Sequence, residues 1–194
     1  MKITFRPVMV SFQLTAIVSI SALLGYSNVC AQGQVATHCT ATERTFISAK
    51  MQKVHTSKAG TTFSPTGKVL SICINPQGQT ITQMTYRYGA PGKVEFEQSA
   101  SADSRFAIFS RSITPHTGEN VIGFSKGHFH YYVTQALGMG SGVSLIVFGN
   151  GKRIADLFSG NDEGEDFFSL QDEFDFDAIK SPVLVRRAPA DDLK

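Results

Sequence analysis

Two closely spaced histidines are the first candidates for chemistry in this chain of 194 residues. His128 and His130 lie in a segment that alternates polar and apolar residues, so both side chains should point to one face of a β-strand. Two imidazoles at this spacing can bind Zn²⁺ or Cu²⁺ if a third ligand, such as His116 or a carboxylate, folds beside them. The same alternation is typical of an ordinary half-buried strand. A metal site and a plain strand face therefore remain as alternatives.

Acidic residues offer weaker candidates. Glu95 and Glu97 could resemble the carboxylate pair of a glycosidase, but outward acids on either side of Phe96 are also typical of an edge strand. The acidic run at residues 161–166 could attract Ca²⁺, although it lacks the spacing of an EF-hand loop. The chain has no Gly-x-Ser-x-Gly elbow and no glycine-rich phosphate loop. Enzymatic activity is therefore disfavoured, and we expect no cofactor.

The N-terminal segment has the pattern of a secretory signal peptide. Basic residues precede an apolar run at residues 8–24, and the tripeptide Val29-Cys30-Ala31 predicts cleavage after residue 31. The alternative is an uncleaved membrane anchor, for which the apolar run is short and interrupted. Lipid modification at Cys30 is disfavoured because Val29, and not a smaller residue, precedes it. We therefore expect a periplasmic or secreted protein without membrane contact after cleavage.

Two cysteines remain after this cleavage, Cys39 and Cys73. In an oxidising compartment such a pair most simply forms one disulfide, which would stabilise the fold by about 3–4 kcal/mol in the loop-entropy model. The alternative is a reactive thiol at Cys39 activated by His38. Neighbouring residues of a strand point in different directions, so the sequence favours the disulfide.

The distribution of charge excludes one class of partner. Loss of the signal removes two basic residues from a chain of net charge +2, so the mature chain is nearly neutral. A neutral chain is a poor ligand for nucleic acid. Residues 156–177 contain nine acidic residues and no lysine or arginine, and phenylalanines are interleaved with the acids. We expect the phenylalanines to dock on the domain while the acids face water or a basic surface.

The hydrophobic pattern predicts an all-β fold. Alternation of period two, punctuated by turns such as Asn150-Gly151, is typical of an antiparallel β-sandwich or small barrel of about eight strands. A weak helical rhythm after Thr42 predicts a short helix or an ordered loop, and residues 57–67 read as loop. We expect one domain at residues 32–179 and a flexible tail at 180–194. The expected strands cover residues 69–74, 80–88, 93–97, 106–112, 120–125, 128–135, 143–148 and 152–158.

Two motifs carry a resemblance to a known group. The segment Gly67-Lys68-Val69-Leu70-Ser71-Ile72-Cys73 and the later Tyr86-Arg87-Tyr88-Gly89-Ala90-Pro91-Gly92-Lys93-Val94-Glu95 resemble an uncharacterised family of small exported proteobacterial proteins with GKxLSxC and YRYGxPGKxE motifs. The resemblance implies an exported, β-rich fold and no particular reaction. The chain departs from the family in the distant position of Cys39 and in having no cysteine after the Ala155-Asp156-Leu157 segment. The family therefore does not dictate the cysteine pairing.

These observations predict a non-enzymatic binding or structural module whose partner is a protein or small molecule of the cell envelope. The protein also resembles the small β-barrel lysozyme inhibitors of Gram-negative bacteria in its expected export, size, β content and single disulfide. This is an analogy of architecture alone. The acidic segment could then meet a cationic hydrolase. The third alternative is a metal-binding protein or metal-dependent enzyme that uses His128 and His130.

Overall fold

A single β-sheet runs through the computed structural model, which describes residues 35–138, 140–162 and 164–187. The predicted signal peptide lies outside the described residues. None of the described residues belongs to a helix long and apolar enough to cross a membrane. The strands are β1 (Arg44–Ser57), β2 (Gly60–Gln77), β3 (Thr80–Ala90), β4 (Lys93–Ser99), β5 (Phe106–Thr114), β6 (Thr117–Lys126), β7 (Phe129–Gly138), β8 (Val143–Gly149), β9 (Lys152–Phe158), β10 (Phe167–Ser169) and β11 (Leu184–Arg186), and a 3-10 helix, η1, spans Gln171–Glu173.

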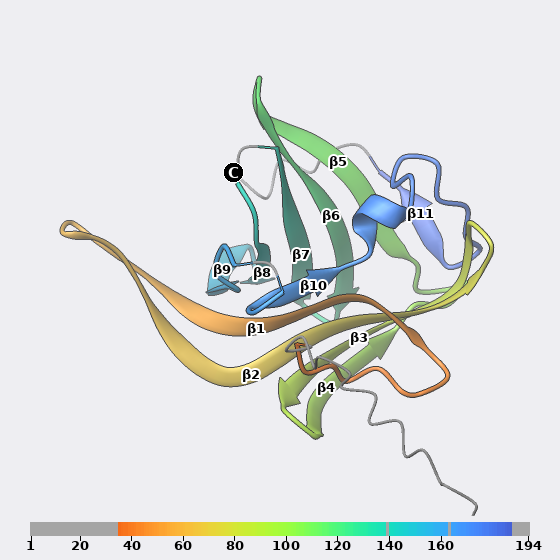
Figure 1. The fold of residues 1–194 in the computed structure, drawn as a ribbon, viewed down its shortest axis with the longest axis horizontal. Coiled ribbons are helices and arrows are strands. Elements are labelled where there is room, and N and C mark those ends of the chain that lie inside the picture. Colours follow the sequence, from red (N-terminus) through yellow and green to blue (C-terminus); the bar gives the residue numbers. More distant parts are fainter. Residues whose placement is uncertain (1–34, 139, 163, 188–194) are drawn as a thin grey trace, which may run out of the picture. The chain divides into compact units, whose positions relative to one another are not determined.

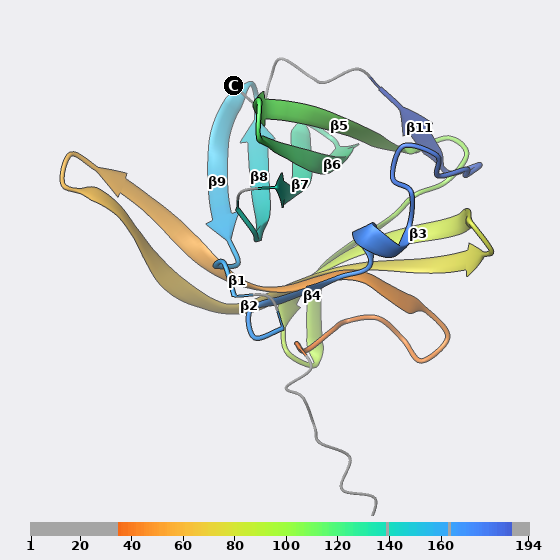
Figure 2. The same ribbon diagram turned by 45° about the horizontal axis from the view of Figure 1, so that its top comes forward.

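Ten of the strands follow one path in the order β11-β5-β6-β7-β8-β9-β1-β2-β3-β4, and β10 pairs separately with β1. The sheet curls strongly into a half-barrel, which Figure 1 and Figure 2 show from two directions. All strand pairs are antiparallel except β11 with β5. The prediction of an all-β antiparallel fold is confirmed, and the eight expected strands correspond to β2–β9.

The first strand corrects the expectation of a helix or loop after Thr42. β1 pairs with β2 from Ser57↔Gly60 to Arg44↔Ile74, so most of the expected loop at residues 57–67 is also strand. Two register shifts interrupt this ladder, one between Thr45 and Ile47 and one further along. A bulge moves the following side chains to the other face, and this breaks the alternation of period two. The sequence pattern therefore hid a strand.

Aromatic side chains fill the concave side of the sheet. Tyr86 of β3 is 1% exposed, and its ring lies 5.0 Å from that of Phe124 on β6. Phe124 in turn stacks on Phe106 and Tyr131 at 4.7 and 4.8 Å. These contacts join β3 to β5, β6 and β7, strands that lie far apart in the order of the sheet. The aromatic cluster therefore helps to hold the curl of the half-barrel.

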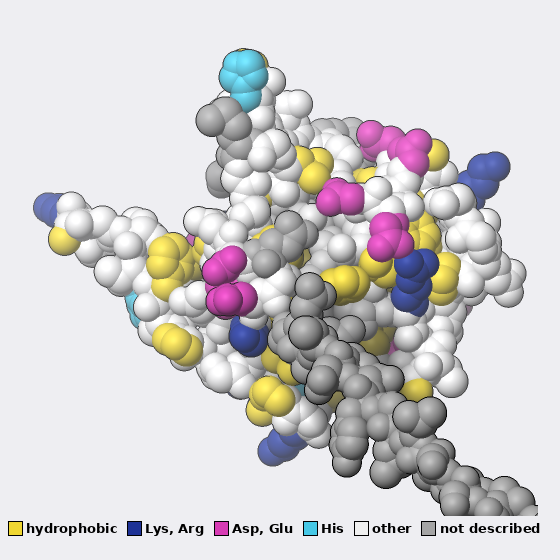
Figure 3. Space-filling view, in the orientation of Figure 1, with side chains coloured by type: hydrophobic (Ala, Val, Ile, Leu, Met, Phe, Trp, Pro, Cys, Tyr) yellow, Lys and Arg dark blue, Asp and Glu magenta, His cyan; other side chains and the backbone are white. Residues whose placement is uncertain are grey.

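The acidic C-terminal segment completes the core. β10 pairs with residues 47–49 of β1, and the ring of Phe174 lies 5.5 Å from that of Phe46. The acids point outward, and Figure 3 shows acidic side chains gathered on the face that carries β10 and η1. The expected docking is therefore seen for Phe167, Phe174 and Phe176, whereas Phe168 is 39% exposed. The buried apolar residues of this segment are Phe167, Leu170, Phe174, Phe176 and Ile179.

The boundary of the predicted flexible tail is corrected. β11 pairs in parallel with the start of β5, with Leu184 opposite Phe106 and Arg186 opposite Ile108. Leu184 is buried in the main core. Residues 180–187 therefore belong to the domain, because Leu184 packs in the core and β11 pairs with β5 at the edge of the sheet.

Candidate functional site

The three histidines proposed as metal ligands do not come together. His116 lies in the turn before β6, whereas His128 lies in the turn after it. The ten residues of β6 separate these turns, a length of about 30 Å at the rise of an extended strand. His116 is therefore wrong as a third ligand for the His128–His130 pair. No group of three or more His, Cys, Asp or Glu among the described residues could hold a metal ion.

The other acidic candidates have structural partners. Glu95 contacts Lys68 at 2.5 Å and Glu97 contacts Arg87 at 2.6 Å, so each carboxylate engages its own cation. In the run at residues 161–166, the backbone N–H of Asp166 donates to the carbonyl of Asp162 at 2.9 Å, which forms a turn into β10. Residue 163 lies outside the described residues. Among the described residues, neither set belongs to a group that could hold a metal ion, and Glu95 and Glu97 each pair with a cation.

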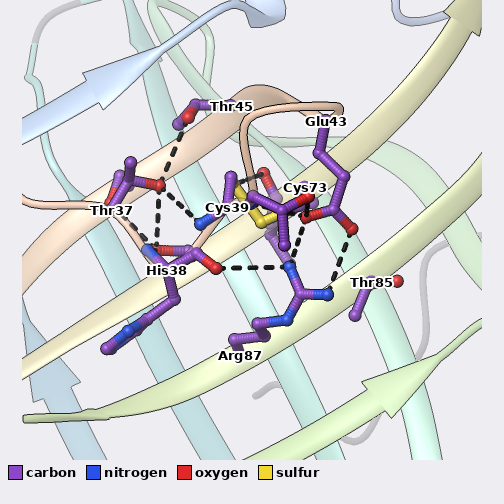
Figure 4. The surroundings of a disulfide bond; sticks show 12 residues. Thr37, His38, Cys39, Glu43, Thr45, Cys73, Thr85 and Arg87 are labelled. Carbon is purple, nitrogen blue, oxygen red and sulfur yellow. Dashed lines mark hydrogen bonds and ion pairs between the residues drawn. A yellow bond between two sulfur atoms is a disulfide. The ribbon is translucent and has the colours of Figure 1, made fainter. Parts of the chain in front are cut away.

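The predicted disulfide joins Cys39 to Cys73, with an S–S distance of 2.03 Å (Figure 4). The bond fixes residues 35–43 on the convex face of β2, where the backbone N–H of His38 donates to the Ser71 hydroxyl at 3.0 Å. The ring Nε2 of His38 lies 3.2 Å from the Gly89 carbonyl oxygen and not at the sulfur atoms. The alternative of a thiol activated by His38 is not what the structure shows.

The same N-terminal segment supplies a buried ion pair. Arg87 donates from both terminal nitrogens to Glu43, at 2.6 and 3.1 Å, and the side chains are only 12% and 8% exposed. Arg87 also contacts the His38 carbonyl at 3.3 Å (Figure 4). Burial raises the pKa of Glu43, but hydrogen bonds from Arg87 and Thr40 outweigh it, so the net pKa lies below the usual value of glutamate. The folded state therefore favours the charged carboxylate.

The Glu43→Gln variant should unfold about 2 kcal/mol more easily at neutral pH, because Arg87 loses the more buried of its two charged acceptors, Glu43 and Glu97. A carboxyl group with a lowered folded pKa contributes stability above its unfolded pKa of about 4.3, and that contribution is lost as the pH falls through the folded pKa. The difference between variant and wild type should therefore shrink on acidification. Urea unfolding at about pH 7 and about pH 3 measures it. A penalty that stays constant with pH, or an equal one for the exposed control Glu165→Gln, would contradict the ion-pair origin.

A groove of about 540 Å³ lies on the convex side of β5, β6, β7 and β11. Its floor is apolar, because alternate residues of β5 point away from the core: Ile108 points inward while Ala107 and Phe109 line the groove. A side chain at Gly123 would lie 3.1 Å from the ring of Tyr132, so glycine lets this ring lie against the strand. The complete lining comprises Ala102, Asp103, Ser104, Arg105, Ala107, Phe109, Gly123, Phe124, Ser125, His130, Tyr132, Val185 and Arg187. We call it the outer groove.

Basic side chains lie around the floor of the outer groove. His130 reaches it from β7 and pairs across the strands with Ser125, whose hydroxyl lies 2.8 Å from Nδ1. Arg105 comes from the loop before β5. Arg187 follows β11, and its backbone N–H donates a hydrogen bond to the Ile108 carbonyl. Asp103 is the one carboxylate in the lining. Guanidinium and imidazole groups beside an apolar floor suit an anionic ligand that also has an apolar part.

Sequence reasoning found one residue of the outer groove and missed the others. The spacing of the histidines singled out His130, although for a metal. Arg105 and Arg187 carried no signal, because they come together only through the parallel pairing of β11 with β5. A three-residue strand leaves too little pattern to be recognised in advance.

Comparison of the chain with models of protein families, with curated proteins and with solved structures finds no match. The resemblances to the exported proteobacterial family and to lysozyme inhibitors therefore stay predictions.

Proposed function

We propose that this protein is an exported, non-enzymatic binding module whose outer groove takes a small anionic ligand with an apolar part. The observation that carries the proposal is the pairing of Arg105, Arg187 and His130 with a floor of apolar side chains in one groove. Its volume of about 540 Å³ lies within the range of small-molecule sites, about 300–1,000 Å³. The secretory pattern at residues 1–31 and the disulfide support a periplasmic or secreted location.

Electrostatics favours an anion in the outer groove. Neither Arg105 nor Arg187 forms an ion pair with another described residue, and Asp103 offsets only part of the positive charge. Arginine presents a planar set of donors that matches a carboxylate, sulfonate or phosphate. The buried rings of Phe109 and Tyr132 supply the apolar contact that holds the rest of the ligand.

The anionic dye 1-anilinonaphthalene-8-sulfonate and its neutral analogue N-phenyl-1-naphthylamine test the proposal. The double variant Arg105→Ala, Arg187→Ala should bind the sulfonate dye about tenfold more weakly, because water screens part of the attraction between the arginines and the sulfonate. Binding of the neutral dye, which depends on the apolar floor, should change by less than about twofold. Fluorescence titration of folded protein measures both affinities.

The matched control is Lys93→Ala, which removes an exposed cation from β4, at the other edge of the sheet. It should leave both affinities unchanged, and circular dichroism should show the same fold for all variants. Equal losses for the two dyes would point to a damaged groove without an anion site. Unchanged sulfonate binding in the double variant would overturn the proposal.

A further inference from the structure

The sheet opens between β1 and β9. These strands pair at only two positions, Gln52↔Phe158 and Lys53↔Leu157. Beyond them β1 continues with β2 as a two-stranded arm, while β9 stays with β8, and Figure 2 shows the two directions separating. Residues 54–57 of β1 and 152–156 of β9 therefore turn backbone edges toward each other with no strand between them among the described residues. We call this opening the β1–β9 notch.

Apolar side chains lie exposed in the notch. A groove of about 270 Å³ is lined there by Lys53, Val54 and residues 153–157. Ile154 is 57% exposed, although it lies beside an open strand edge. Open edges are usually protected by charge, proline or a covering segment, since they offer unpaired N–H and C=O groups to other chains. Ile154 therefore leaves an apolar side chain uncovered beside an open edge.

The net charge around the notch is positive. Arg153 pairs with Asp156 at 3.0 Å, which leaves Lys53 and Lys152 without an ion pair to any described residue. The whole hairpin of β1 and β2 contains no Asp or Glu. Acidic side chains would therefore be attracted to this opening, and basic ones repelled.

We propose that the β1–β9 notch binds an extended segment of a partner protein in which apolar and acidic residues alternate. The segment adds to the open edge of β9 as a further strand, so its backbone forms hydrogen bonds with residues 152–156. Successive side chains of a strand point to opposite faces, so the acidic set reaches the face of Lys53 and Lys152 while the apolar set packs on Val54 on the other face. Ile154 lies on the same face as Lys152, since its side chain approaches Gly149, the cross-strand partner of Lys152. This interaction surface is separate from the outer groove.

The probe is a hexapeptide of alternating valine and glutamate with both ends capped. It is added to ¹⁵N-labelled protein that is expressed from the full-length chain. Amides of residues 152–156 should shift and exchange more slowly with solvent. A peptide with lysine in place of glutamate should bind at least about tenfold more weakly. A peptide with alternate backbone nitrogens methylated should not protect these amides, because it lacks the donors of one edge.

The Ile154→Asp variant should bind the glutamate peptide about tenfold more weakly, because it loses apolar contact and adds charge repulsion. Ile113→Asp is the matched control, because Ile113 on β5 is 55% exposed and lies away from the notch. It should leave binding unchanged, as should the double variant of Arg105 and Arg187. Protection at another edge, undiminished binding of the methylated peptide, or normal binding by Ile154→Asp would each overturn the proposal.

Discussion

Replacing Cys39 and Cys73 together with alanine is expected to lower the free energy of unfolding by about 3–4 kcal/mol. The bond closes a loop between residues 34 positions apart, and breaking it returns that freedom to the unfolded chain. The same bond holds the segment that carries Glu43 against Arg87. Loss of the disulfide should therefore weaken the ion pair between Glu43 and Arg87 as well as free the loop in the unfolded chain.

Urea unfolding of the variant and of reduced wild-type protein measures this effect separately from any packing loss at Cys73, which is 1% exposed. Both samples should show nearly the same loss of stability. Reduced wild type that keeps its stability within about 1 kcal/mol would show that hydrogen bonds alone, such as that from the Ser48 hydroxyl to the Ala36 carbonyl at 2.7 Å, hold the N-terminal segment.

Tyr86→Ala should lower the free energy of unfolding by about 3–5 kcal/mol, because it leaves a cavity at the centre of the aromatic cluster. The Tyr86 ring contacts Phe96, Phe124 and Tyr131, at centroid distances of 5.7, 5.0 and 6.3 Å. It thus joins β3 and β4 to β6 and β7 through the interior of the half-barrel. Removal of the ring should loosen the curl of the sheet as well as reduce apolar burial.

Thermal and urea unfolding measure the loss at Tyr86, and Tyr86→Phe serves as the control that keeps the ring and removes the hydroxyl. The phenylalanine variant should lie within about 1 kcal/mol of wild type. If alanine prevents folding, Tyr86→Leu gives a smaller cavity that can still be measured. Equal losses for phenylalanine and alanine would assign the effect to the hydroxyl and contradict the packing argument.

The sequence predicted the middle of the fold better than its ends. Strands β2–β9 contain alternating or continuously apolar runs and are separated by turn residues such as Asn150, whose φ of 51° lies in the left-handed region. β1 was missed because a register shift places Phe46 and Ile47 side by side in the core. β10 and β11 have three residues each and exist only through distant partners.

The candidate site was less predictable than the fold, for a related reason. His130 could be singled out by its spacing, since spacing is local. Its groove partners Arg105 and Arg187 depend on a parallel pairing between segments that are remote in the chain. His116 was predicted as a third ligand if it folded beside the pair, whereas the extended strand β6 places it at the opposite end from His128.

The C-terminal segment has a consequence for the timing of folding. It lies against the first strand, as in the ion pair of Arg44 with Glu173, residues 129 positions apart. Contacts between such distant residues slow folding, because a long loop must close before they form. Until residues 167–179 have left the ribosome, Phe46 of β1 lacks the ring of Phe174, and β1 lacks its pairing with β10. The core of the domain can therefore be completed only near the end of synthesis.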